Sequence, residues 1–385
     1  MVRRRPGEIR DAIRDYLEGQ RADASVSDIR LSVAARLGDV AASSVRSYLR
    51  LNAGDAFVRT SYGRYGLRSG VSRREVGEAL GVYSASVVRQ GRAELWEGDC
   101  LAWLENRPER SVHAVVTDPP YGLLEYTPEQ QAKLRDRSGG VWRIPPSFDG
   151  HERSPVPRFT VLKGKDLAEL ERFFHVWALR LYPVLVPGAN VLIASNPLLS
   201  CLVSGAVARA GFERRGEIVR LVMTMRGGDR PKNAHEEFPD VSVMPRSMWE
   251  PWLLFRKPLE GRVQDNLRTW GTGGLRRISP EQPFGDVIQS RPTSPRERRL
   301  APHPSLKPQA FLRQIVRAAL PQGNGIVLDP FAGSGSTLAA AEAIGYQSIG
   351  VEQDPHYFRM AGAAIPQLAS FQIERSNQLS LRYSR

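Results

Sequence analysis

The run Asp118-Pro119-Pro120-Tyr121 combines residue types that suit a flat ligand carrying an amino group. The Asp118 carboxylate accepts hydrogen bonds, and the two prolines form a stiff turn with carbonyl acceptors but no N–H donors. The Tyr121 ring offers a flat face on which a planar ligand can stack. Exocyclic amino groups of nucleobases are ligands of this kind. The same four residues could also be an ordinary turn at the end of a strand, with the tyrosine capping the core.

The seven residues before this turn, at 111–117, predict a buried strand. Valine and alanine dominate the run with few polar interruptions, as in a parallel sheet that is covered on both faces. Asp118 would then follow the carboxyl end of the strand, at the edge where α/β sheets bind their ligands. Position and residue type together make the turn a candidate catalytic site.

A glycine-rich segment at 329–337 lies farther along the chain, between an apolar strand and an alanine-rich helix. A second strand follows at 345–351 and ends in Glu352. Strand, glycine-rich turn, helix and strand form the unit that binds nucleotides in α/β folds. In such units the glycines let the backbone approach the ligand, and the acid accepts hydrogen bonds from ribose hydroxyls. The segment therefore predicts a nucleotide or nucleoside cofactor.

Together with His303-Pro304-Ser305-Leu306-Lys307-Pro308, these motifs resemble the amino-methyltransferases that use S-adenosylmethionine on DNA. Because Asp-Pro-Pro-Tyr precedes the glycine-rich segment, the order is similar to the circularly permuted β class, over residues 94–368. The resemblance implies S-adenosylmethionine as cofactor, double-stranded DNA as substrate and no metal. It implies a catalytic role for Asp118, Pro119, Pro120 and Tyr121. Contacts with the cofactor are implied for Asp99, His303, Ser305, Lys307, Asp329, Phe331, Gly333, Gly335, Ser336, Thr337 and Glu352.

The reaction implied by the resemblance is in-line transfer of a methyl group to the exocyclic amine of a base flipped out of the duplex. Aspartate at the start of the motif favours adenine N6, since the cytosine N4 enzymes of this family more often begin it with serine. Cytosine N4 methylation stays open as an alternative, as does a non-catalytic DNA-binding regulator that retains the fold. For Asp99 the alternative role is that of a helix N-cap.

The charge of the chain favours a polyanionic partner. Lys and Arg number 54 against 41 Asp and Glu, which gives a formal net charge of +13. Such an excess is typical of nucleic-acid binding. No apolar run approaches the length of about 20 residues that spans a membrane, and the start of the chain lacks the apolar core of a secretion signal. We expect a cytoplasmic, nucleoid-associated protein of a prokaryote or phage, and the resemblance adds a homodimer and a cognate restriction enzyme as candidate partners.

The alternation of predicted strands and helices indicates an α/β class. We expect a Rossmann-like methyltransferase domain with a largely parallel sheet and helices on both faces, plus a small N-terminal winged-helix-like domain. The expected divisions are a winged-helix-like module at 1–68, a linker at 69–92, a catalytic half at 93–260 with a lid loop at 122–165, an irregular target-recognition segment at 261–300, a cofactor-binding half at 301–368 and a tail at 369–385.

Two basic regions are candidates for DNA binding. The N-terminal module shows three short amphipathic helices and a hairpin, and its candidate contacts are Arg46, Arg50 and Arg64. The segment 261–300 holds eight arginines against four acids, and arginine suits both phosphates and guanine edges. Its candidate contacts are Arg268, Arg276, Arg277, Arg296, Arg298 and Arg299. The alternatives are a protein-docking winged helix and a solvated basic loop.

Overall fold

The chain divides into two compact units, residues 1–84 and 85–385. The computed structural model describes residues 8–20, 24–38, 40, 45, 49, 57–61, 64–67, 86–120, 147–148, 151–152, 164–222, 228, 230–231 and 233–373. In these ranges no helix is both long and apolar enough to cross a bilayer.

The first unit packs helices on a small antiparallel sheet. Its elements are α1 (Glu8–Gln20), β1 (Ala24–Ser25), α2 (Val26–Leu37), β2 (Phe57–Ser61) and β3 (Arg64–Leu67), and the strand order is β1-β3-β2. The apolar periodicity explains the packing, because Ile13, Ile29 and Val33 are fully buried in one core. Val45 and Leu49, from the third predicted helix, are helical and join that core. The winged-helix assignment stays a prediction.

Helix α2 begins earlier than the sequence suggested. We expected Ser27 and Asp28 to start it, but Ser25 is the N-cap, because its side chain accepts the backbone N–H of Asp28. Gly38 ends the helix with a φ of +76°, a backbone conformation that favours glycine.

The second unit is built on a nine-stranded sheet in the order β12-β10-β11-β9-β6-β13-β14-β5-β4. The pairs β6·β9, β6·β13, β13·β14, β14·β5 and β10·β12 are parallel, whereas β9·β11, β10·β11 and β4·β5 are antiparallel. The expectation of a largely parallel sheet is confirmed. The strands are β4 (Val87–Gln90), β5 (Ala93–Glu97), β6 (Val112–Thr117), β9 (Leu185–Ala194), β10 (Glu213–Leu221), β11 (Trp249–Arg256), β12 (Val287–Gln289), β13 (Ile326–Asp329) and β14 (Gln347–Glu352).

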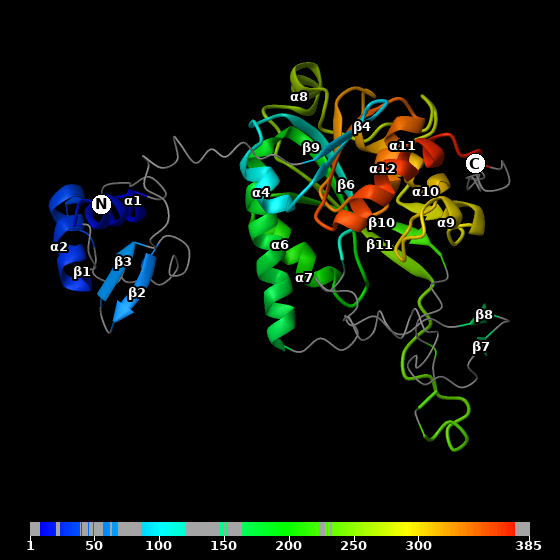
Figure 1. Ribbon diagram of the computed structural model, residues 1–385, viewed down its shortest axis with the longest axis horizontal. Coiled ribbons are helices and arrows are strands. Elements are labelled where there is room, and N and C mark those ends of the chain that lie inside the picture. Colours follow the sequence, from blue (N-terminus) through cyan, green and yellow to red (C-terminus); the bar gives the residue numbers. More distant parts are fainter. Residues whose placement is uncertain are drawn as a thin grey trace. The chain divides into compact units, whose positions relative to one another are not determined.

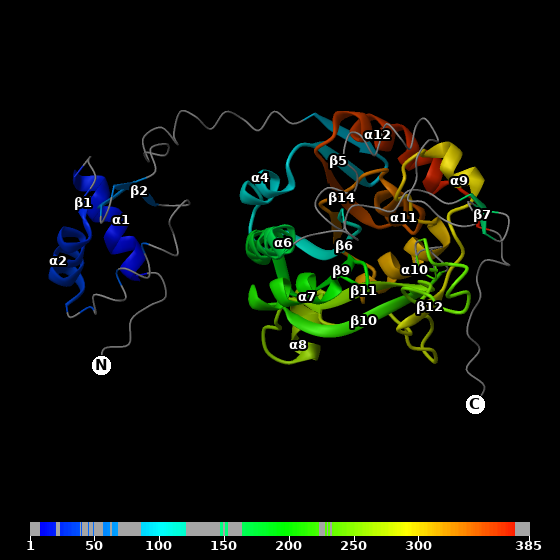
Figure 2. The same cartoon turned by 90° about the horizontal axis from the view of Figure 1, so that it is seen from below.

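Helices cover both faces of this sheet, as predicted. Figures 1 and 2 show α4 and α6 on one side of the strands and α10, α11 and α12 on the other. Burial on both faces explains why β6 is mostly apolar: Ala114 and Val116 pack with Phe311 of α10, while Val115, on the opposite face, is also fully buried. The helices are α4 (Cys100–Glu105), α6 (Gly164–Val184), α7 (Ser200–Arg209), α8 (Val263–Trp270), α9 (Pro295–Leu300), α10 (Gln309–Ala319), α11 (Ser336–Ala343) and α12 (Pro355–Ala369).

Three regions that were expected to be irregular contain regular structure. Residues 87–90, placed in the linker, form the edge strand β4, which pairs with β5. The segment 261–300, expected to be irregular, contains α8, β12 and α9. A capping box starts α9: the Ser294 side chain accepts the N–H of Glu297, and the Glu297 side chain accepts the N–H of Ser294. Within the predicted lid loop, β7 (Ser147–Phe148) pairs with β8 (His151–Glu152), and the rest of that loop before α6 lies outside the described residues.

The direction of the strands places the site. Strands β5, β6, β9, β13 and β14 run parallel, so their carboxyl ends share one edge of the sheet. Because β10 and β12 run antiparallel to β11, which is itself antiparallel to β9, their carboxyl ends lie at that edge too. Figure 1 shows α8 at the top of the sheet, at the opposite edge from the loop that connects β10 to β11.

Candidate active site

Asp118 follows the carboxyl end of β6, in the middle of the sheet. Its side chain is 15% exposed, and Pro119 is buried. The preceding residue, Thr117, is fully buried and donates from its hydroxyl to Asp329 Oδ1 over 2.7 Å. That hydrogen bond joins the end of β6 to the end of β13, so it ties the Asp-Pro-Pro turn to the glycine-rich segment. Tyr121 lies outside the described residues.

Lys307 contacts the Asp118 carboxylate directly. Its Nζ lies 2.7 Å from Asp118 Oδ2 and 3.0 Å from Glu250 Oε1. Burial by itself would lower the pKa of the Lys307 ammonium, but the carboxylates of Asp118 and Glu250 outweigh burial and raise the pKa. The group is therefore a cation at neutral pH. The sequence placed Lys307 among the cofactor contacts, whereas the structure places its ammonium on Asp118.

Glu250 and Arg220 extend this contact into a buried chain of charges. Arg220 Nη1 lies 2.7 Å from Glu250 Oε2, and the two side chains are 6% and 9% exposed. Arg220 also donates to Ser290 Oγ and to the carbonyl of Arg291. Two cations and two carboxylates alternate from Asp118 to Arg220, so each buried charge has an opposite neighbour. Sequence reasoning missed Glu250 and Arg220, although a charged residue inside an apolar strand is itself a signal of a buried pair.

Asp329 ends β13 at the start of the glycine-rich segment. It is 3% exposed, and its Oδ1 accepts the N–H of Phe331 as well as the Thr117 hydroxyl. Burial raises the pKa of Asp329 to about 6, while hydrogen bonds from Thr117, Thr337 and Phe331 oppose the rise. Asp329 therefore fixes the geometry of the turn that leads into α11.

Glu352 ends β14 and lies beside that turn. Its Oε2 accepts the N–H of Gly333 over 2.7 Å, and its Oε1 accepts the N–H of Asp354 over 2.8 Å. Burial raises the pKa of Glu352, and these backbone hydrogen bonds oppose the rise. An acid at the end of the second strand thus sits against the glycine turn, as the sequence predicted for the βαβ unit.

Gly333 and Gly335 are required for different reasons. Gly333 has a φ of +50°, and a Cβ there would lie 3.3 Å from the His303 ring. Gly335 has a φ of +73°, and a Cβ there would lie 2.7 Å from Ile365 of α12. Packing against α12 therefore requires glycine at position 335. At Gly333 the lack of a side chain leaves the backbone uncovered beneath the His303 ring.

His303 covers the glycine turn as a neutral ring. Its Nδ1 accepts the N–H of Ser305, and the ring packs edge-on against Tyr357 with centroids 4.4 Å apart. Burial, with help from the Lys307 ammonium, lowers the pKa of His303 to about 4. The segment 303–307 therefore spans from the glycine turn to Asp118.

The remaining predicted cofactor contacts have structural roles in the described chain. Asp99 is the N-cap of α4, accepting the N–H groups of Leu101 and Ala102, at the carboxyl end of β5. The Phe331 ring packs near Phe173 and Trp177 of α6. Ser336 and Thr337 are buried in the first turn of α11. Asp99 is thus an N-cap, a role that is compatible with its predicted contact to the cofactor.

The structure divides the arginines of segment 261–300 between the two edges of the sheet. Three lie near the amino ends of the strands: Arg268 pairs with Asp265, Arg276 donates to the Tyr346 hydroxyl just before β14, and Arg277 donates to backbone carbonyls. Helix α9 is at the Asp118 edge, because Glu297 Oε1 accepts the N–H of Gln309, two residues after Lys307. Its exposed arginines are Arg296, Arg298 and Arg299. The side chains of Arg46, Arg50 and Arg64 lie outside the described residues.

A family model described as DNA methylase, of the N6/N4 methyltransferases, matches residues 112–363. The chain belongs to this family. It is a β-class DNA amino-methyltransferase, its cofactor is S-adenosylmethionine and its substrate is DNA. The match runs from the first residue of β6 into α12, so it spans the catalytic turn, the 303–307 segment and the glycine turn.

Individual relatives are distant from this chain. The Type II methyltransferase M.HindIII of Haemophilus influenzae is 22% identical over 294 residues, which is 69% of this chain and 93% of that protein. M.HinfI, also of Haemophilus influenzae, is 22% identical over 272 residues, or 69% of this chain and 66% of that protein. Similar solved structures include the PvuII cytosine-N4-specific DNA methyltransferase, with a TM-score of 0.45 and 15% identity over 72% of this chain and 91% of that one. Another is the M1.HpyAVI complex with its cofactor, with a TM-score of 0.42 and 18% identity over 70% and 98%.

Proposed function

We propose that this methyltransferase modifies adenine N6 on a base flipped out of duplex DNA. The observation that carries the proposal is the Asp118 carboxylate, held by Lys307 at the carboxyl end of β6 and linked through Thr117 to the glycine turn. A carboxylate at that point can accept one N–H of an amine that faces the cofactor. Aspartate, where cytosine N4 relatives more often have serine, favours adenine.

The chemistry asks for preorganised acceptors. The lone pair of an aromatic amine is delocalised into the ring, so the amine is a poor nucleophile. Acceptors at Asp118 and the Pro119 carbonyl favour a pyramidal nitrogen and stabilise the positive charge that develops on it during transfer. Lys307 fixes one Asp118 oxygen in place, and Glu250 offsets the charge of the ammonium. Tyr121 would replace the stacking that a flipped base loses.

The cofactor supplies a methyl group on a positively charged sulfur. The site has features that fit it: a buried acid, Glu352, lies beside the bare backbone of Gly333 at the shared edge of β13 and β14. We assign Glu352 to the ribose hydroxyls and Gly333 to the close backbone approach. His303 and Ser305 would close over the methionine end, and Asp329 would hold the shape of the turn.

DNA should lie against the edge of the sheet that carries Asp118. The net charge of +13 and the exposed arginines of α9 support this placement. Arg46, Arg50 and Arg64 would add phosphate contacts from the first unit. The homodimer, the cognate restriction enzyme and the nucleoid association follow from the family resemblance alone, and they stay predictions.

Nucleoside analysis of DNA from expressing cells tests the proposal. We expect N6-methyladenine in DNA from cells with the wild-type protein and none from cells with Asp118→Ala. Detection of N4-methylcytosine instead would show that the target is cytosine N4, and the assignment as a DNA amino-methyltransferase would stand. Absence of both modifications, with cofactor binding intact in calorimetry, would instead support the non-catalytic regulator.

A further inference from the structure

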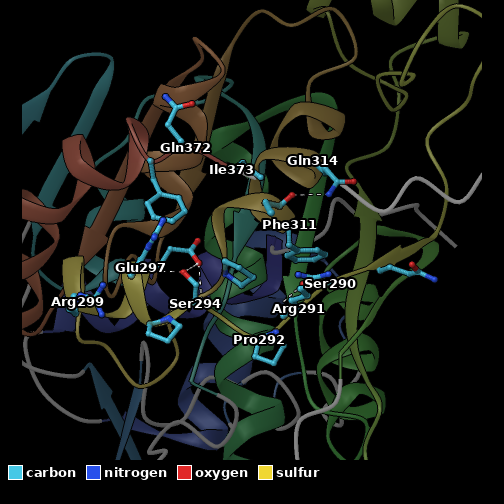
Figure 3. Close-up of a pocket in the computed structure, with 16 residues that line it drawn as sticks. Ser290, Arg291, Pro292, Ser294, Glu297, Arg299, Phe311, Gln314, Gln372 and Ile373 are labelled. Atoms are coloured by element: carbon cyan, nitrogen blue, oxygen red, sulfur yellow. Dashed lines mark hydrogen bonds between the residues drawn. The ribbon is translucent and has the colours of Figure 1, made fainter. Parts of the chain in front are cut away.

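A pocket lies beside α9, with a volume of about 510 Å³. Three stretches line it: residues 289–299, the first turns of α10, and residues 371–373 after α12. Figure 3 shows Arg291 and Arg299 on two sides of it, with Ser294 and Glu297 between them in this view and Gln314 and Gln372 farther along the wall. Its lining among the described residues includes none of the cofactor or catalytic residues assigned above, so it is a separate cavity.

The pocket is positively charged. Arg291, Arg296 and Arg299 line it, and all three are exposed. Of its described lining residues, Glu297 alone is acidic, and its oxygens accept hydrogen bonds from Ser294 N, Ser294 Oγ and Gln309 N at 3.0, 2.8 and 2.8 Å. The carboxylate is therefore committed to the start of α9, and the cavity presents guanidinium groups to an anion such as a phosphate.

The rest of the lining suits more than a bare phosphate. Phe371 and Ile373 are half-buried and offer apolar surface, and the amide side chains of Gln289, Gln314 and Gln372 line the wall. Aromatic rings stack on bases, and glutamine amides pair with base edges. The volume lies in the range of pockets that enclose a small organic ligand. The lining therefore suits a nucleotide, with its phosphate on the arginines and its base on the aromatic and amide side chains.

The pocket lies at the edge of the sheet where we place the substrate DNA. Gln289 ends β12, whose carboxyl end shares the sheet edge with Asp118. Pro308, in the lining, directly follows Lys307. On the other side, Arg220 donates to Ser290 Oγ over 3.0 Å and to the Arg291 carbonyl over 3.3 Å. The wall of the pocket is therefore continuous with the charge chain that ends on Asp118.

We infer that this pocket holds one nucleotide of the substrate DNA near the target base, with its phosphate on the arginines and its base against Phe371. The inference rests on the proposed function, because it takes DNA as the substrate at the Asp118 edge. It gives residues 371–373, which the sequence assigned to a tail, a part in DNA binding. It also assigns DNA binding to Arg291, which was not among the DNA contacts predicted from the sequence. Arg291 lies at the Asp118 edge, unlike the arginines at the opposite edge of the sheet.

The first test measures how DNA affinity depends on salt. Anisotropy titrations of the full-length protein with a labelled duplex, at several salt concentrations, compare wild type with Arg291→Ala, Arg299→Ala and the double variant. Removing one phosphate contact should reduce the slope of log affinity against log salt by about 0.9. Arg214→Ala is the matched control, since Arg214 is an exposed arginine at the amino end of β10, paired with Glu217, and should keep the wild-type slope.

The second test isolates the aromatic contact. Phe371→Ala should weaken duplex binding on the order of tenfold without changing the salt slope, because base stacking releases no counterions. Phe371→Leu keeps apolar packing without a ring and should weaken binding similarly. Cofactor affinity, measured by calorimetry, should be unchanged in every variant, which checks that the fold is intact.

Two results would overturn the inference. The first is wild-type slopes and affinities in the arginine and Phe371 variants while the wild-type enzyme methylates DNA. The second is tight binding of deoxyadenosine monophosphate or inorganic phosphate that does not compete with duplex, which would make the pocket a small-molecule site. Failure of the proposed function looks different, because the wild-type enzyme itself would then leave DNA unmethylated.

Discussion

Lys307 Nζ lies 2.7 Å from Asp118 Oδ2, so the carboxylate at the centre of the proposed reaction is held by an ammonium 189 residues away in the chain. The ammonium is shared with Glu250, which is in turn paired with Arg220. This arrangement makes Asp118 one end of a buried, electrically balanced chain. Its orientation therefore depends on Lys307 and, through Lys307, on Glu250 and Arg220.

Removing the ammonium should cost both stability and activity. Lys307→Met leaves two neighbouring buried carboxylates with one cation, and breaking a buried pair in this way costs about 3–5 kcal/mol. Methyl transfer should fall by roughly a hundredfold, because Asp118 loses its fixed orientation. Denaturant unfolding and transfer rates provide the two measurements.

The double variant Lys307→Met/Asp118→Asn supplies the control for charge balance. It removes the carboxylate that Lys307→Met leaves without a cation and keeps the Arg220–Glu250 pair, so it should be more stable than Lys307→Met alone while transfer stays low. Equal stability of the single and double variants would contradict the account of the charge chain.

The buried carboxyl group of Asp329 should make stability depend on pH. Burial raises its pKa from the ordinary 3.8 to about 6, so the folded state favours the neutral form. The stabilisation is complete below about pH 4 and is lost as the pH rises through about 6, which removes on the order of 1 kcal/mol between pH 5 and pH 7. Asp329→Asn keeps an acceptor oxygen and should flatten this part of the profile.

Unfolding at pH 5 and pH 7 gives the comparison, and Asp265→Asn is the control. Asp265 is an exposed carboxylate of α8 paired with Arg268, so its replacement should leave the wild-type pH dependence in place. Identical profiles for wild type and Asp329→Asn would show that Asp329 does not titrate in this range.

Alanine substitutions at three glycines with positive φ should distinguish the cost of backbone strain from the cost of a steric clash. Gly345 has a φ of +81° with no atom within 4 Å of an added Cβ, so Gly345→Ala should cost only about 1–2 kcal/mol of strain. Gly335→Ala adds a clash with Ile365 and should cost roughly 2–4 kcal/mol. Gly333→Ala brings a Cβ to 3.3 Å from the His303 ring, so it should cost more stability than Gly345→Ala and less than Gly335→Ala, and it should lower cofactor affinity. Equal effects of all three on unfolding and on calorimetric cofactor binding would refute this division of roles.

The first unit should strengthen DNA binding without choosing the sequence. Deleting residues 1–84 leaves the second unit with its own sheet and core. If the unit only binds one or two phosphates, the deletion should weaken duplex binding on the order of tenfold at moderate salt. Sequencing of methylated positions should give the same motif as the full chain. A changed motif would move target recognition into the first unit.

The sequence predicted those parts of the site that are local. The run at 112–117 has few polar residues, so its burial in a parallel sheet, and the place of Asp118 at its end, could be predicted from the pattern alone. Glu352 and the glycine turn were found in the same way, because one βαβ unit contains both. The capping box at Ser294 and Glu297 was a local signal for α9 that went unused.

Contacts between distant segments could not be predicted. The pairing of Lys307 with Asp118, and of Glu250 with Arg220, depends on the strand order β10-β11-β9-β6, which no local pattern encodes. Gly335 shows a related limit: its type was expected from ligand approach, but the atom that excludes a side chain belongs to Ile365 of α12. The glycine indicated a close contact at position 335, but only the fold identified the residue that makes this contact.

The most direct test is single-turnover transfer of a labelled methyl group from the cofactor to duplex DNA. We predict transfer by the wild-type protein and a fall of at least about a hundredfold in Asp118→Ala, with the cofactor dissociation constant unchanged in calorimetry. Asp118→Asn, which retains a carbonyl oxygen but no charge for Lys307, should lie between the two. Near wild-type transfer by Asp118→Ala would contradict the assignment of Asp118 as the acceptor of the target amine.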